Sequence, residues 1–211
     1  MRAWLFASCL LPAVVAAQQP TPPTVPTNLS RADEIRFARS AAPADVSNGA
    51  KVWVLENGHY VVAVQGTSGM ACAVYRDRPN SFVPICGDSV AEATVLAIGR
   101  FQTEERLAGK TLDEIKPEVA RGLASGRFRV PRTPALTYMT SSAQVITDTA
   151  GEHPTRFLPH LMVFYPNMHA KGLGLVDSNS MDIPLLDEEG TPMSRLVVVV
   201  RDWTQPDIPT Q

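Results

Sequence analysis

The sequence has little charge, and neither sign dominates. Charged residues make up 19% of the 211 positions, and 19 Lys plus Arg stand against 21 Asp plus Glu, for a formal net charge of -2. A domain that binds nucleic acid or an anionic membrane through a basic face normally carries a clear excess of Lys and Arg. The composition therefore predicts no nucleic-acid partner. With 45% hydrophobic residues, the chain is typical of one ordinary globular domain.

Long apolar runs are missing except at the start of the chain. Residues 4–15 are apolar apart from Ser8, follow Arg2 and lead into the small residues Ala16 and Ala17. This stretch is shorter than the roughly 20 residues of a membrane-spanning helix, and its parts stand in the order of an export signal. We expect residues 1–17 to be a signal peptide and the mature chain to have no transmembrane segment. The protein is then periplasmic or secreted.

Proline gathers at the two ends of the predicted mature chain. Four prolines lie within residues 18–29 and two within 204–211. Such segments bury little apolar surface and favour extended chain. We therefore expect a Pro-rich disordered tether over 18–29, a single domain over 30–203 and a disordered tail over 204–211.

Cysteine is scarce, and its spacing excludes the common reactive motif. Cys9 falls within the predicted signal, which leaves Cys72 and Cys86 with no C-x-x-C arrangement. Two cysteines in an exported domain most simply form one disulfide. Closing a loop of about 15 residues contributes roughly 3 kcal/mol to stability.

The best-known catalytic and nucleotide-binding motifs are also missing. The sequence contains no G-x-x-x-x-G-K-[ST], no G-x-G-x-x-G after a strand and no H-E-x-x-H. Residues 66–70 begin like the turn that presents a nucleophilic serine, but Met70 stands where glycine is required. We interpret Ser68 as part of a hairpin turn.

The first half of the domain is predicted to be a helix followed by three strands. Ser30 is a good N-cap for a helix over 31–40. Alternating apolar residues predict strands at 51–55, 60–65 and 70–76, and Asn57-Gly58 is a strong hairpin signal between the first two. We expect these strands to form an antiparallel meander.

Helices are predicted next. Ser89 and Glu92 have the spacing of a capping box for a helix that runs to about residue 107. Thr111 and Glu114 form a second such box. We expect Pro117 to break that helix, with a further segment over 117–125 that ends on Gly126.

The C-terminal part is predicted to return to strands, at 136–140, 143–147, 160–165 and 195–201. The continuous β-branched run in the last of these favours a strand covered on both faces. A short helix or loop is expected over 167–175, and an acidic turn over 187–190. The fold class is therefore α+β: a single domain whose antiparallel sheet combines the N-terminal meander with C-terminal strands, with helices inserted between them.

Histidine and carboxylate residues concentrate in one region of the C-terminal half. Imidazoles and carboxylates are the groups that metal sites and acid–base centres use. The candidate catalytic residues are His153, His160, His169, Tyr165, Asp177 and Asp182, and the three histidines are also the candidate ligands of a divalent metal. On a strand at 160–165, His160 and Tyr165 point to opposite faces, and His153 and His169 lie on loops near its two ends. This geometry disfavours one ion bound by all three histidines, and solvated loop histidines remain the simpler interpretation.

Short motifs along most of the mature chain resemble a group of uncharacterised exported bacterial proteins. The motifs are Ser40-Ala41-Ala42-Pro43, Val54-Leu55, Gly58-His59-Tyr60, Gly66-Thr67, Cys72, Pro159-His160-Leu161-Met162 and Gly190-Thr191-Pro192. The resemblance implies a Gram-negative periplasmic or secreted location, and it implies no activity.

Two hypotheses for function follow. The first is a non-catalytic module of the cell envelope that binds a small ligand, a metal or a protein partner. The second is a small exported hydrolase or metal-dependent enzyme that uses His160 with His153 or His169 and a nearby carboxylate such as Asp177 or Asp182. No motif requires a cofactor.

Overall fold

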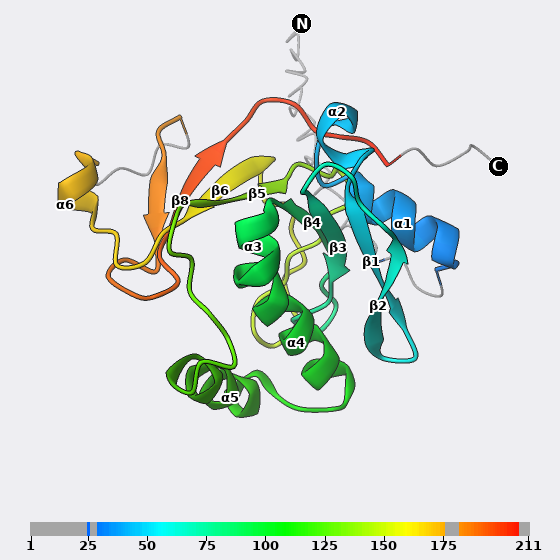
Figure 1. Cartoon of the computed structure of the whole chain (residues 1–211), viewed down its shortest axis with the longest axis horizontal. Helices are drawn as coiled ribbons and strands as arrows, with labels where there is room; N and C mark the ends of the chain where they lie inside the picture. Colours follow the sequence, from blue (N-terminus) through cyan, green and yellow to red (C-terminus); the bar gives the residue numbers. More distant parts are fainter. Residues whose placement is uncertain (1–24, 26–28, 176–181, 207–211) are drawn as a thin grey trace, which may run out of the picture.

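The computed structural model describes residue 25 and residues 29–175 and 182–206 (Figure 1). The predicted signal peptide, most of the predicted tether, Asp177 and residues 207–211 of the predicted tail lie outside the described residues. Thr204, at the start of the predicted tail, donates its backbone N–H to the Thr140 carbonyl oxygen at 2.8 Å. The described fold therefore continues past residue 203.

Eight strands form one sheet that is antiparallel at every pairing except one. The order across the sheet is β2-β1-β3-β4-β5-β6-β8-β7, and β1 and β3 are the parallel pair. The strands are β1 (Lys51–Glu56), β2 (His59–Val64), β3 (Ala71–Tyr75), β4 (Val83–Gly87), β5 (Ala135–Met139), β6 (His160–Phe164), β7 (Leu185–Asp187) and β8 (Arg195–Val199). The expected mixture of helices with a mainly antiparallel sheet is confirmed.

The first three strands do not form the expected meander. The β1–β2 hairpin is present, and Asn57 and Gly58 both have the positive φ that a tight turn needs. The third strand, however, returns beside β1 and not beside β2. The chain crosses close to β1 at Gly66, where a Cβ atom would lie 2.3 Å from the Lys51 backbone nitrogen. Because β3 occupies the other side of β1, β2 lies at the edge of the sheet.

Two further strand predictions need correction. Residues 143–147 form a loop whose backbone pairs with the fold through the isolated bridges Phe82–Val145 and Ile146–Thr155. The Ser141 hydroxyl accepts the Ala143 N–H and turns the chain at the start of this loop. The last strand, β8, lies second from the sheet edge, and Val197 is its only buried residue. It is therefore covered mainly on one face.

Six helices accompany the strands in the described part of the chain: α1 (Arg31–Arg39), α2 (Ala44–Ser47), α3 (Ser89–Ala93), α4 (Val95–Leu107), α5 (Leu112–Ala124) and α6 (Ala170–Leu173). Ser30 caps α1 as predicted, and Thr111 and Glu114 form both bonds of the predicted capping box of α5. Gly126 has φ +77° just after α5, in agreement with the predicted left-handed position.

Three details of these helices differ from prediction. Asp88 caps α3 in place of Ser89, since its carboxylate accepts the Ala91 N–H. The expected single helix is divided at Thr94, whose backbone leaves the helical region. In α5, Pro117 does not break the helix. The proline removes only the bond to the Asp113 carbonyl, and the exposed position of Asp113 in the first turn lets water replace that bond.

Helices cover the two faces of the N-terminal half of the sheet differently (Figure 1). One face packs on α1, where Phe37 and Ala38 meet Val52, Val54 and Val74. The other face packs on α3 and α4 through residues such as Val95 and Leu96. The helix α5 stands away from the sheet, below α4 in this view. The sheet thus separates two apolar cores.

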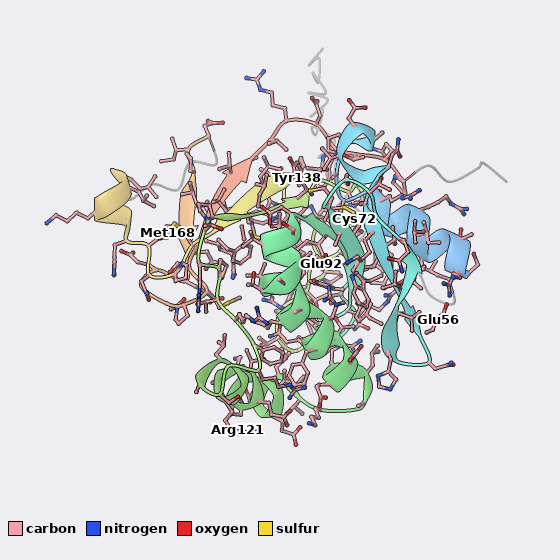
Figure 2. The ribbon with its side chains drawn as sticks, in the orientation of Figure 1. Glu56, Cys72, Glu92, Arg121, Tyr138 and Met168 are labelled. Carbon is pink, nitrogen blue, oxygen red and sulfur yellow. A yellow bond between two sulfur atoms is a disulfide. The ribbon has the colours of Figure 1, made fainter. Side chains whose placement is uncertain are left out.

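The predicted disulfide is present between Cys72 and Cys86, and both residues have 0% exposure. They are directly opposite each other on β3 and β4 (Figure 2 labels Cys72). The covalent bond therefore joins two central strands inside the core beneath α1.

Candidate functional site

A cavity of about 400 Å³ lies on the α4 side of the sheet, over β4, β5, β6 and β8. Its walls include residues of α4 and of the loops around residues 77–81 and 146–157. Leu185, Met193 and Arg195, in and around β7 and β8, complete the lining. The cavity is the space left on that face.

The floor of the cavity is apolar because strand side chains alternate between faces. Met162 and Val197 are directly opposed on β6 and β8, and Met139 lies opposite His160 on β5. Together with Ile85 these side chains line the cavity, and each apolar member is less than 9% exposed. The site is suited to an apolar ligand.

His160 is the polar side chain in this apolar floor. It is 3% exposed, and its Nδ1–H donates a 2.7 Å hydrogen bond to the Leu158 carbonyl oxygen. The edge of its ring contacts Phe157, with the centroids 4.9 Å apart. Burial lowers the pKa of His160 below its usual value, so the imidazole is neutral near pH 7. With the proton on Nδ1, the Nε2 atom is a hydrogen-bond acceptor.

Each charged side chain that lines the cavity lies near a charge of the opposite sign. Asp77 lies beside Arg78, and burial raises the pKa of the Asp77 carboxyl while Arg78 opposes that rise. Arg78 donates to the Thr147 carbonyl oxygen at 2.8 Å. Arg195, which also lines the cavity, forms ion pairs with Asp187 and Glu188. Among the described residues, therefore, no cation that lines the cavity lacks a nearby carboxylate, and none is left free to bind an anionic ligand.

The α4 wall is fixed by a close contact. The Tyr75 hydroxyl donates to the Leu96 carbonyl oxygen at 2.8 Å, and its ring lies against Gly99. Both Tyr75 and Gly99 line the cavity. The position of α4, and hence the width of the cavity, depends on the fact that residue 99 is glycine and has no side chain.

The structure does not gather the three candidate histidines around this cavity. His160 lines it, whereas His153 is exposed and pairs with Asp148 at 2.7 Å, and His169 is exposed and pairs with Glu189 at 3.3 Å. Tyr165 is 44% exposed just beyond β6. Asp182 is exposed too, and Asp177 lies outside the described residues.

One exposed group has the composition of a metal site. Ligand atoms of Asp148, Glu152 and His153 lie within 4.8 Å of one another. The same Asp148 carboxylate accepts the backbone N–H groups of Ala150 and Glu152 as well as the His153 proton. These bonds account for the turn by themselves, so the divalent metal stays a prediction.

Sequence reasoning missed Asp77, Phe157 and Arg195 as cavity residues. Each lies in a different segment, and only strand pairing and loop closure bring them near His160. The alternation of side chains along a strand predicts that His160 and Met162 share one face. This signal identifies residues of the cavity floor, but it does not identify the residues that loops bring to the cavity.

Comparisons with known proteins add no assignment: no family model matches the chain, and no curated protein or solved structure gives a significant match. Among the described residues no helix is both long and apolar enough to cross a bilayer.

Proposed function

We propose that this protein is an exported, non-catalytic binding module of the cell envelope that holds a small apolar ligand in the cavity over β5, β6 and β8. The observation that carries this proposal is the buried imidazole of His160 in the apolar floor of a cavity of about 400 Å³. The buried disulfide is consistent with an oxidising compartment. The location itself rests on the N-terminal sequence pattern.

The hydrogen-bonding groups of the cavity define the ligand. The Nε2 atom of His160 has no partner among the described residues, and as an acceptor it requires a donor on the ligand. An anionic ligand is disfavoured because Arg195 is already matched by two carboxylates. The ligand class is therefore an uncharged apolar molecule with one O–H or N–H group.

The enzyme hypothesis has less support from this geometry. Acid–base catalysis by two histidines requires both within reach of one substrate, yet His160 is the histidine that lines the cavity. His153 and His169 each face a carboxylate on the surface. A hydrolase that uses His160 remains the alternative function, and the same experiments examine it.

The test uses N-phenyl-1-naphthylamine, an uncharged fluorescent probe with one N–H group, and the mature protein. We expect the fluorescence emission of the probe to rise on binding. Met162→Trp places a larger side chain on the cavity floor and should abolish that rise. Val163→Trp is the matched control because Val163 is the next residue on β6 and points to the opposite face. Binding that survives Met162→Trp, or that never occurs, overturns the proposal.

Displacement of the probe then tests the ligand class. We expect 1-decanol to compete at least about fivefold better than its methyl ether or decanoate, since one hydrogen bond is worth about 1 kcal/mol. His160→Phe should remove this preference for the alcohol and change the dissociation constant of the probe by no more than a fewfold. Equal competition by all three compounds contradicts the donor requirement and leaves the apolar site intact. Turnover of esters that is lost in His160→Phe would favour the enzyme alternative.

A further inference from the structure

A second cavity, of about 500 Å³, lies on another part of the surface. One side is the chain that leaves α5, and the other is formed by Pro166 and Asn167 after β6 and by Pro192 before β8. The walls from the first side are Leu123, Ala124, Phe128, Arg129, Val130 and Arg132. None of these residues lines the first cavity, so this site is independent of the proposed function.

Charge distinguishes the second cavity from the first. Arg129 and Arg132 line it, and none of the described residues that line it carries a carboxylate. Neither guanidinium has a hydrogen bond or ion pair with the described part of the chain. The sequence around them contains no Asp or Glu from 119 to 147, and Arg121 and Arg127 add to the same region. The cavity is therefore positively charged even though the whole chain is slightly acidic.

The basic wall is held in place by packing. The Phe128 backbone N–H donates to the Gly122 carbonyl oxygen at 2.9 Å, and a Cβ atom on Gly122 would lie 2.3 Å from the Phe128 ring. The same ring packs against Phe101 with the centroids 5.1 Å apart, and Arg127 lies over both rings. Because these contacts form without a ligand, little ordering accompanies binding.

The opposite wall is also fixed and adds a polar group. Asn167 has φ +58° and donates its backbone N–H to the Thr191 carbonyl oxygen at 2.8 Å, which joins the two loops. The Asn167 side-chain amide faces no hydrogen-bonding partner among the described residues. It is an additional donor beside two arginines.

We propose that this second cavity binds an organic anion, with its carboxylate or phosphate on Arg129 and Arg132 and its apolar part against Phe128, Val130 and Pro192. Planar guanidinium groups bind both kinds of anion through paired N–H donors. The apolar walls distinguish an organic anion from an inorganic one. A soluble metabolite and a lipid headgroup present the same chemistry, and the experiment separates them.

The experiment is calorimetric titration of the mature protein with phenyl phosphate at low ionic strength. We expect saturable binding at least about tenfold tighter than that of inorganic phosphate, because the ring is removed from water. Arg132→Gln should weaken binding at least about tenfold through loss of a charge-assisted contact. The matched control is Arg121→Gln, which removes the same charge from the exposed outer side of α5 (Figure 2) and lies outside the cavity.

The outcomes distinguish a specific binding site from nonspecific attraction to a basic surface. An equal loss in Arg121→Gln and Arg132→Gln, inorganic phosphate that binds as tightly as phenyl phosphate, or no binding at all overturns the proposal. An unchanged melting temperature of Arg132→Gln shows that its loss of binding is not a folding defect. Vesicles of phosphatidylcholine with and without phosphatidic acid then identify the source. Retention on the acidic vesicles that requires Arg132 indicates a lipid headgroup, and no retention indicates a soluble anion.

Discussion

The Tyr75 ring occupies the space that a side chain at position 99 would need: a Cβ atom on Gly99 would lie 2.3 Å from the Tyr75 Cε2 atom. Tyr75 is buried on β3, and its hydroxyl is fixed to the first turn of α4. Neither partner can move without disturbing the core between the sheet and the helix.

Gly99→Ala should therefore destabilise the protein by about 1–3 kcal/mol, the usual cost of overpacking a core. The control is Gly172→Ala in α6, where nothing lies within 4 Å of the added Cβ atom. Alanine should be neutral or slightly stabilising there. Urea denaturation of the two variants provides the comparison, and equal midpoints would show that the helix shifts freely.

His160 should titrate below 6.5, because burial disfavours its charged form. The unfolded chain then takes up this proton more readily than the folded chain. The contribution to stability is constant above about pH 6.5 and decreases as the pH falls below that value. Nitrogen-detected NMR should also find the proton on Nδ1. A measured pKa above 6.5, or a proton on Nε2, would contradict the assigned hydrogen bond.

His153 should behave in the opposite way. Its hydrogen bond to Asp148 raises the pKa of His153, and the same bond lowers the pKa of Asp148. The stabilisation from His153 is present below about pH 6.5 and is lost as the pH rises through the raised value. That from Asp148 is lost as the pH falls through its lowered value. In Asp148→Asn the pKa of His153, followed by proton NMR, should fall, and an unchanged value would show that the pair does not form in solution.

Removing the disulfide should cost about 3 kcal/mol, the effect of closing a loop of about 15 residues. The double variant Cys72→Ala and Cys86→Ala should unfold at a lower urea concentration than the oxidised protein. Adding reductant to the native protein without denaturant should change little, because both sulfur atoms are inside the core. Rapid reduction under native conditions would show that the core opens.

The ion pair between Glu34 and Arg76 should matter more than those on the surface. Both Glu34 oxygens accept from Arg76 at 2.8 and 2.9 Å, and their side chains are only 6% and 15% exposed. Glu34→Gln should cost about 3 kcal/mol because it leaves a buried guanidinium without its counter-charge. Glu56→Gln breaks the exposed pair with Arg31 and should cost less than about 1 kcal/mol. Thermal unfolding of the two variants measures both losses of stability. Similar losses would contradict the idea that burial makes the Glu34–Arg76 pair the stronger one.

Local chemistry explains which parts of the fold were predictable. Asn57-Gly58 specifies a hairpin and Ser30 and Thr111 specify helix starts through contacts within a few residues. The pairing of β3 with β1 depends on the contact of Gly66 with Lys51, which no local pattern encodes. The proline in α5 was misjudged because its cost depends on whether water reaches the Asp113 carbonyl.

The sites were harder to predict than the strands. His160 was identified, but its role depends on Leu158, Phe157 and the cavity, which come from the folded arrangement. The second, basic cavity was not predicted from the sequence for a different reason. A net charge summed over the whole chain averages Arg129 and Arg132 with acids that lie elsewhere. Charge counted by segment would have revealed the region without acids.

The strand order has a consequence for how the chain acquires its structure. From β3 to β6 each strand pairs with the next in sequence, and the two non-consecutive neighbours in the sheet are β3 beside β1 and β8 beside β6. As the chain is synthesised from its amino end, β4, β5 and β6 can therefore add one after another to β3. The free edges of β3, β4 and β5 are each covered by the strand that follows in sequence, which shortens the time during which those edges are open to aggregation.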